Sequence, residues 1–289
     1  MELKIWIDGQ FYDKPEAKVS VYDHGFLYGD GVFEGIRVYH GRIFEAKAHL
    51  DRLYHSARAI RLTVPMPPDD LLAAMHEAIR VNGFADCYLR VLVTRGAGYL
   101  GLSPNKCARP SVIIIADTIE LYPPELYERG MAVITASIIR THPNSLSPRI
   151  KSMNYLNNIL AKIEATDADV PEAIMLNQDG NVAECTGDNI FIARDGQVQT
   201  PTTTDGILEG ITRAVIFRLC QNLAIPCVEK TLQRHDLYIA DECFLTGTAA
   251  EVVPVTKIDG RPIGAGVVGP FTRKLMDAFH AYVRQARAT

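Results

Sequence analysis

The 289-residue sequence lacks the features that mark several classes of protein. Its six cysteines are scattered, with no close pair of the kind that binds zinc or forms a redox centre, so we expect thiols in a reducing compartment. The eight histidines show no metal-ligand spacing, and no metal site is expected. A formal net charge of -4 gives no electrostatic reason to expect nucleic acid or an anionic membrane as a partner.

Long apolar runs are also lacking. No stretch is long enough to span a bilayer, and no signal architecture precedes the first predicted strand. Hydrophobic residues make up 47% of the chain and charged residues 22%, which is ordinary for a soluble globular protein. We therefore expect a cytoplasmic protein of one large or two modest domains.

Strand and helix signals alternate along the chain and predict a mixed α/β fold of two domains. Asp8-Gly9 predicts a tight hairpin, and the paired prolines Pro123-Pro124 predict an interdomain connection. We assign residues 1–118 to a small N-terminal α/β domain, 119–129 to an interdomain loop, and 130–289 to a large C-terminal α/β domain. The longer helices are predicted over Ala46–Leu62, from Pro68 to about Gly83, and over Tyr155–Ala168, Thr212–Ala224 and Gly269–Arg287.

The most informative segment is Arg149-Ile150-Lys151-Ser152-Met153-Asn154-Tyr155, which we predict to open a helix. An isolated lysine is most often a solvated surface residue. If the helix has begun by Lys151, however, Tyr155 lies on the same face one turn later. An amine that can form an imine, next to a phenol that can bond a ring oxygen, suits pyridoxal 5'-phosphate (PLP).

A carboxylate and two predicted turns supply the other groups that PLP binding requires. Glu184 follows a predicted turn, and a carboxylate facing the pyridine nitrogen keeps it protonated, which makes the ring an electron sink. Thr212 lies in a glycine-rich segment at a predicted helix start, where free N–H groups favour an anion. Gly247-Thr248-Ala249 offers a second such turn. Arg52 could add a positive charge, although alone we would expect it in an ion pair on the surface of its helix.

The glycine-rich run Gly29-Asp30-Gly31-Val32-Phe33-Glu34-Gly35 does not predict a dinucleotide site. Its last spacing is one residue too long for that fingerprint, and it leads into a strand instead of a helix.

In this order and context, the motifs resemble those of the fold-type IV (class IV) PLP aminotransferases, and among them the branched-chain amino acid aminotransferases. The resemblance runs from about Trp6 to about Arg273. It implies a two-domain fold like that of D-amino acid aminotransferase, with the cofactor at the domain interface. It also implies roles in holding PLP: a Schiff base with Lys151, bonds to the ring from Tyr155 and Glu184, and phosphate binding by Arg52, Ile211, Thr212 and Thr248.

The resemblance also implies which residues line the substrate pocket. Tyr28 and Phe33 belong to the segment that lines it in the family, and Tyr88-Leu89-Arg90 resembles the Tyr-x-Arg that receives substrate carboxylates. The Thr248 and Ala249 amides are implied to hold the α-carboxylate. Tyr122 is a further candidate for the pocket wall.

The loop after Thr94-Arg95-Gly96 separates the activities that share this scaffold. D-amino acid transaminases carry an Arg-x-His carboxylate trap there, whereas Ala97–Leu102 here holds neither residue and suits an aliphatic side chain. The lyase of 4-amino-4-deoxychorismate typically lacks the Gly-Thr-Ala-Ala-Glu motif that begins at Gly247 in this sequence. The absence of proline after Arg90 resembles members with a relaxed substrate range. D-Amino acid transamination, the lyase reaction and PLP or phosphate binding without catalysis remain open as alternatives.

The predicted activity is therefore transamination of L-leucine, L-isoleucine and L-valine with 2-oxoglutarate, giving branched 2-oxo acids and L-glutamate. The partners are small amino and 2-oxo acids, with no nucleic acid and no membrane. The resemblance implies a homodimer or higher homo-oligomer, in which the loop of residues 99–107 reaches the site of the partner subunit.

Overall fold

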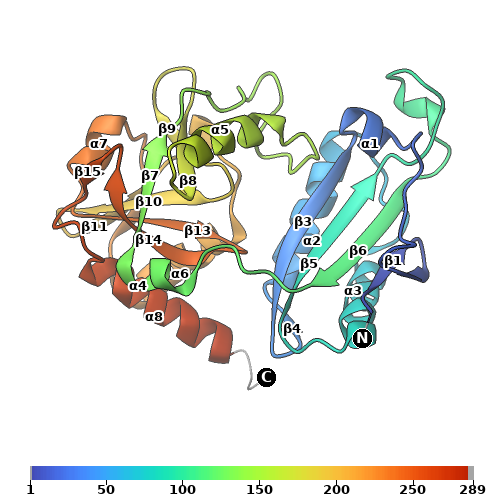
Figure 1. Ribbon diagram of the computed structural model, residues 1–289, viewed down its shortest axis with the longest axis horizontal. Coiled ribbons are helices and arrows are strands. Elements are labelled where there is room, and N and C mark those ends of the chain that lie inside the picture. Colours follow the sequence, from blue (N-terminus) through green and yellow to red (C-terminus); the bar gives the residue numbers. More distant parts are fainter. Residues whose placement is uncertain (1, 286–289) are drawn as a thin grey trace. The chain divides into compact units, whose positions relative to one another are not determined.

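The protein, described here over residues 2–285 by a computed structural model, divides into two compact units (Figure 1). Unit 1 comprises the described residues of Met1–Ile119 together with Ile150–Asn154. Unit 2 comprises Glu120–Arg149 and the described residues of Tyr155–Thr289. Among the helices of residues 2–285, none is both long and apolar enough to cross a membrane.

Unit 1 is built on a six-stranded antiparallel sheet with the strand order β2-β1-β6-β5-β3-β4. The predicted hairpin is confirmed: Asp8 and Gly9 join the first two strands with φ angles of 49° and 95°. A short helix α1 (His24–Tyr28) precedes the third strand, and helices α2 (Ala46–Ala59) and α3 (Pro68–Asn82) cover the sheet. The strands are β1 (Lys4–Ile7), β2 (Gln10–Asp13), β3 (Gly31–Tyr39), β4 (Arg42–Ile43), β5 (Cys87–Thr94) and β6 (Ser111–Asp117).

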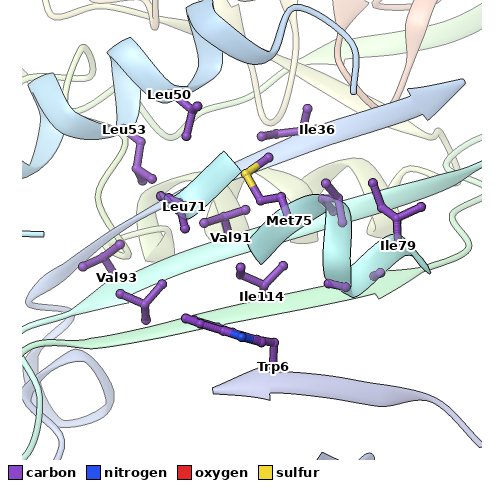
Figure 2. Packing of buried hydrophobic residues seen from close by; sticks show 14 of the residues in the cluster. Trp6, Ile36, Leu50, Leu53, Leu71, Met75, Ile79, Val91, Val93 and Ile114 are labelled. Carbon is purple, nitrogen blue, oxygen red and sulfur yellow. The ribbon is translucent and has the colours of Figure 1, made fainter. Parts of the chain in front are cut away.

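The core of unit 1 lies between this sheet and the two longer helices. Figure 2 shows Leu50 and Leu53 of α2 and Met75 of α3 packed toward Val91 of β5 and its neighbours. Successive residues of a strand point to opposite faces, so the buried alternation along β5 leaves Tyr88 and Arg90 on the face away from the helices. That second face carries Tyr88 and Arg90, with Phe33 of β3 beside Arg90.

Unit 2 holds a nine-stranded mixed sheet with the order β12-β11-β10-β13-β14-β7-β8-β9, and β15 pairs with β14. The β11–β12, β14–β7 and β7–β8 pairs are parallel and the others antiparallel. The strands are β7 (Met131–Thr135), β8 (Glu172–Leu176), β9 (Val182–Cys185), β10 (Asn189–Arg194), β11 (Gln197–Thr200), β12 (Cys227–Glu229), β13 (Glu242–Gly247), β14 (Glu251–Ile258) and β15 (Arg261–Pro262).

Within the described residues of unit 2, five α-helices accompany this sheet. They are α4 (Pro124–Arg129), α5 (Leu156–Asp167), α6 (Ile211–Asn222), α7 (Arg234–Tyr238) and α8 (Pro270–Gln285). The predicted helix that ends at Arg287 extends beyond the described residues, which stop at 285. Strand β14 was not predicted, and it contains Pro254, a residue that usually argues against a strand inside a sheet.

The arrangement differs from the sequence-based expectations in two places. The segment 119–129 is not only a loop, because α4 begins at Pro124, and proline is well tolerated in the first turn of a helix. The helix expected to open at Arg149 begins only at Leu156. Before it, Ile150–Asn154 packs in unit 1 instead of with the C-terminal residues.

Candidate active site

Lys151 lies in an extended segment that pairs with the edge of β3. The Phe33 amide donates to the Lys151 carbonyl at 3.0 Å, and Val32 and Ser152 form an antiparallel bridge. The Lys151 amide donates to Oγ of Ser56 on α2, at 3.1 Å. The lysine is therefore held through its own backbone on two sides, and the surrounding strand explains why no helix forms here.

Several residues predicted to act together meet on one face of unit 1. Nζ of Lys151 lies 4.7 Å from the ring centroid of Phe33, and the Arg90 guanidinium carbon lies 4.8 Å from the same ring. Arg90 also stacks on the ring of Tyr88, at 5.5 Å. No carboxylate of the described residues forms an ion pair with Arg90, so its guanidinium can receive an external anion.

Gly35 shapes this face by having no side chain. A Cβ at this position would lie 1.7 Å from the hydroxyl oxygen of Tyr88. The tyrosine therefore reaches across β3 only because residue 35 is glycine, and this explains one glycine of the run that resembled a dinucleotide fingerprint.

Arg52 forms a buried ion pair, not a surface pair along its helix. Its Nε and Nη2 donate to the two carboxylate oxygens of Glu34 on β3, at 2.7 and 2.8 Å. Nδ1 of His49 donates to the same carboxylate at 2.8 Å. His49, Arg52 and Ser56 follow helical spacing on α2, so one face of this helix positions both the ion pair and Lys151.

The electrostatics of this cluster are strong because it is out of water. Burial raises the pKa of Glu34, but the charge and hydrogen bonds of Arg52, with His49, outweigh it and bring the pKa down to about 2. Burial lowers the pKa of His49 and keeps the imidazole neutral, against the opposing effect of Glu34. Arg52 is held in a fixed geometry by its two-pronged bond to Glu34.

Tyr28, the other predicted pocket residue of unit 1, lies at the end of α1. Its hydroxyl accepts a hydrogen bond from the amide of Gly101 at 3.1 Å, which ties α1 to the predicted 99–107 loop. Tyr99, Leu100 and Leu102 in that loop are strongly exposed.

In unit 2, Glu184 is buried on β9 and positioned by three donors. Nε of Arg140 donates to Oε1 at 2.9 Å. The amide of Leu208 and Nδ2 of Asn189 donate to Oε2, at 2.9 and 3.2 Å. In all three bonds the carboxylate oxygens are acceptors, and the bond from Arg140 is charge-assisted. Sequence reasoning did not anticipate Arg140, which comes from a segment far from Glu184 in the chain.

Two adjacent residues, Asp188 and Asn189, support the two predicted anion-binding turns. A Cβ on Gly247 would lie 2.0 Å from Oδ1 of Asp188. A Cβ on Gly210 would lie 2.0 Å from Oδ1 of Asn189. Each glycine thus allows a polar side chain to lie directly against the backbone of a turn.

Both turns present unused donors. Gly210 is the N-cap of α6, and the amides of Ile211 and Thr212 have no acceptor in the part of the chain that the structure describes. Oγ1 of Thr212 is buried and likewise has no partner among those residues. In the second turn, the amides of Thr248 and Ala249 donate to no described group. This donor pattern suits anions.

Tyr122 and Tyr155, two further predicted site residues, lie in unit 2. Tyr122 is only 5% exposed, and its hydroxyl donates toward Asp188 at 3.0 Å and Glu172 at 3.3 Å. Tyr155 is the half-buried N-cap residue of α5. The helical spacing expected between Lys151 and Tyr155 is therefore wrong, since Lys151 precedes the helix.

Comparison with known proteins gives a consistent result. Residues 31–258 match the model of the family described as amino-transferase class IV. A putative branched-chain-amino-acid aminotransferase of Methanocaldococcus jannaschii is 50% identical over 277 residues, covering 96% of this chain and 95% of that protein.

Two solved structures add to this likeness. The branched-chain amino acid aminotransferase of Escherichia coli has a TM-score of 0.94 and 36% identity, covering 97% of this chain and 94% of that one. The branched-chain amino acid aminotransferase of Thermobaculum terrenum in its PLP form has a TM-score of 0.87 and 31% identity, covering 98% and 94%.

Proposed function

Because this chain belongs to the class IV aminotransferases, we propose that it is a PLP-dependent branched-chain-amino-acid aminotransferase. It transfers the amino group of L-leucine, L-isoleucine or L-valine to 2-oxoglutarate, giving branched 2-oxo acids and L-glutamate. The observation that carries this proposal is Lys151 over the Phe33 ring beside an Arg90 that no described carboxylate neutralises. The relatives with branched-chain names at high coverage support the substrate class.

The residues present fit PLP. Thr212 has a buried hydroxyl without a partner in the described chain, next to unpaired amides at the start of α6, and such a site suits a phosphate. The buried carboxylate of Glu184, fixed by Arg140, suits a protonated ring nitrogen. We assign Arg52, Ile211, Thr212 and Thr248 to the phosphate. Bound PLP supplies an electron sink that stabilises negative charge at Cα of the substrate.

The chain's own residues then have distinct tasks. Nζ of Lys151 would hold PLP, and its free amine would accept the proton that leaves Cα of the substrate and later return it. Glu184 keeps a positive ring nitrogen in place, and Arg140 orients Glu184. Tyr155 bonds the ring oxygen. Together these contacts fix the reacting atoms in position, which lowers the entropic cost of reaction.

Substrate selection is assigned to the polar and aromatic face of unit 1 and to the second turn. Phe33 and Tyr28 bound the aliphatic side chain, with Tyr122 as a further wall, and Arg90 beside Tyr88 receives the distal carboxylate of glutamate. The free amides of Thr248 and Ala249 receive the α-carboxylate.

The test uses the visible absorption band of the purified, PLP-loaded protein. Addition of L-leucine alone should abolish the band, and 2-oxoglutarate should restore it. A response to D-alanine with none to L-leucine would favour D-amino acid transamination instead. Absence of any band at saturating PLP would refute the role of Lys151.

We infer a homodimer or higher homo-oligomer, which the molecular mass in solution would test. The six free cysteines support a reducing, cytoplasmic setting, which localisation of the tagged protein would test.

A further inference from the structure

A buried pair of carboxylates lies beneath the turn to which we assign the substrate's α-carboxylate. Asp188 and Glu172 are 5% and 2% exposed, and the hydroxyl of Tyr122 bridges them. The Oε1 atom of Glu172 already accepts from the amide and the hydroxyl of Thr186, at 3.1 and 2.6 Å. One tyrosine proton cannot satisfy two ionised carboxylates, so a second proton is favoured in this cluster.

That second proton belongs on Asp188. Burial raises the pKa of Asp188 to about 7, and the charge of Glu172 adds to the rise. Glu172 has more donors than Asp188, because Thr186 and the Ala173 amide also bond it. The groups that face Asp188 are Glu172 of β8, Tyr122, Lys162 of α5, and Glu184 and Cys185 of β9.

The position of Asp188 makes its charge matter for the turn above it. Its Oδ1 lies where a Gly247 side chain would begin, one residue before the free amides of Thr248 and Ala249. Like charges this close in a buried site repel strongly, because the effective dielectric constant is far below that of water. An ionised Asp188 therefore opposes an anion on the turn, whereas a neutral one does not.

We propose that Asp188 is a positioning residue that must carry a proton for the Gly247-Thr248-Ala249 turn to bind the substrate's α-carboxylate. Binding is then coupled to the uptake of a solvent proton by the Asp188 carboxylate, and release of the product returns it. This inference rests on the proposed function, since it assumes that the turn holds the α-carboxylate.

The sign of the pH effect follows from linkage. A bound anion raises the pKa of Asp188 further, so affinity is greatest below about pH 7 and falls as the pH rises through that value. If the bound anion strengthens proton binding by Asp188 roughly tenfold, the affinity at about pH 8 is roughly fivefold weaker than at about pH 6. Proton uptake near pH 7.5 is then about half a proton per site.

The experiment is isothermal titration calorimetry of the holoenzyme with 4-methylvalerate, a branched carboxylate that has no amine to titrate. The enzyme is held in its pyridoxamine 5'-phosphate form, and buffers of different ionisation enthalpy report the protons taken up. The control is Asp188→Asn, which keeps the shape of the neutral acid. We expect proton uptake and the pH dependence of affinity to disappear in Asp188→Asn while binding itself persists.

Two further variants separate this coupling from a merely structural role. Glu172→Gln removes the charge that raises the pKa of Asp188, so the midpoint of the affinity profile should move to lower pH. Tyr122→Phe removes a donor to the ionised carboxylate, so the midpoint should move to higher pH. These opposite movements also test the proposal should Asp188→Asn fail to fold.

Three outcomes would count against the inference. Equal proton uptake in the wild type and in Asp188→Asn would overturn the role of Asp188. Weaker binding in Glu172→Gln and Tyr122→Phe with an unmoved midpoint would reduce the cluster to a structural one. No binding of 4-methylvalerate to the wild type at any pH would instead refute the proposed function, and this inference with it.

Discussion

The buried ion pair between Glu34 and Arg52 should contribute measurably to the stability of the protein. Substituting Glu34→Gln keeps the shape of the side chain but removes the charge that Arg52 and His49 share. Because Glu34 is fully buried and Arg52 nearly so, water cannot replace the lost partner. Loss of the carboxylate beside this guanidinium should destabilise unit 1.

The magnitude follows from the pKa of Glu34. The difference between the ordinary value of 4.5 and about 2 corresponds to about 3 kcal/mol of stability at neutral pH. Removing one partner of a buried pair typically costs about 3–5 kcal/mol. We therefore expect Glu34→Gln to lower the free energy of unfolding by about 3 kcal/mol.

The assay is urea unfolding of the protein at neutral pH, with Asp51→Asn as the matched control. Asp51 forms an exposed ion pair with Lys47 on α2, the helix that also carries Arg52. Loss of this pair should lower the free energy of unfolding by about 0.5 kcal/mol or less. The double variant Glu34→Gln/Arg52→Gln should be more stable than Glu34→Gln alone. A Glu34→Gln protein as stable as Asp51→Asn would refute the reasoning.

Acid adds an independent check. The folded-state pKa of Glu34 is depressed, so its contribution is complete above about 4.5 and is lost as the pH falls toward about 2. The stability gap between the wild type and Glu34→Gln should therefore narrow across that window. A gap that stays constant down to about pH 2 would contradict the assignment.

Three other predictions concern the proposed chemistry. Lys151→Ala should reduce the turnover of L-leucine by roughly 10²- to 10⁴-fold or more while unfolding near the wild-type midpoint; retained turnover would exclude its role in proton transfer. Glu184→Gln should keep PLP but lose about 10²-fold in rate, and Arg140→Gln should show a smaller loss in the same stopped-flow assay. Thr212→Val should leave the apoprotein as stable as before, because its buried hydroxyl has no described partner to lose, yet weaken PLP binding by roughly tenfold in equilibrium dialysis; unchanged affinity would remove Thr212 from the phosphate site.

Local sequence patterns were enough to predict several elements of the fold. The Asp8-Gly9 hairpin follows from two residues that tolerate positive φ, and the helices α2 and α3 follow from apolar spacing and their end signals. Strand β14 was not predicted, because Pro254 argues against a strand in the interior of a sheet. Its pairing with β13 and β7, which stabilises it, is not visible in the local sequence.

By itself, the sequence determined which chemical groups are available and in what order: the lysine, the glutamate, the glycine turns and the apolar loop after Gly96. These local patterns were enough to identify the family and to predict the candidate site residues, but they did not predict Arg140, which pairs with Glu184. Their settings depend on hydrogen bonds and ion pairs between segments far apart in the chain. Only the tertiary structure decided that Lys151 extends beside β3, that Glu34 pairs with Arg52, that Arg140 holds Glu184, and that Asp188 lies against Gly247. Such pairings arise from strand register and packing, which no short sequence pattern specifies.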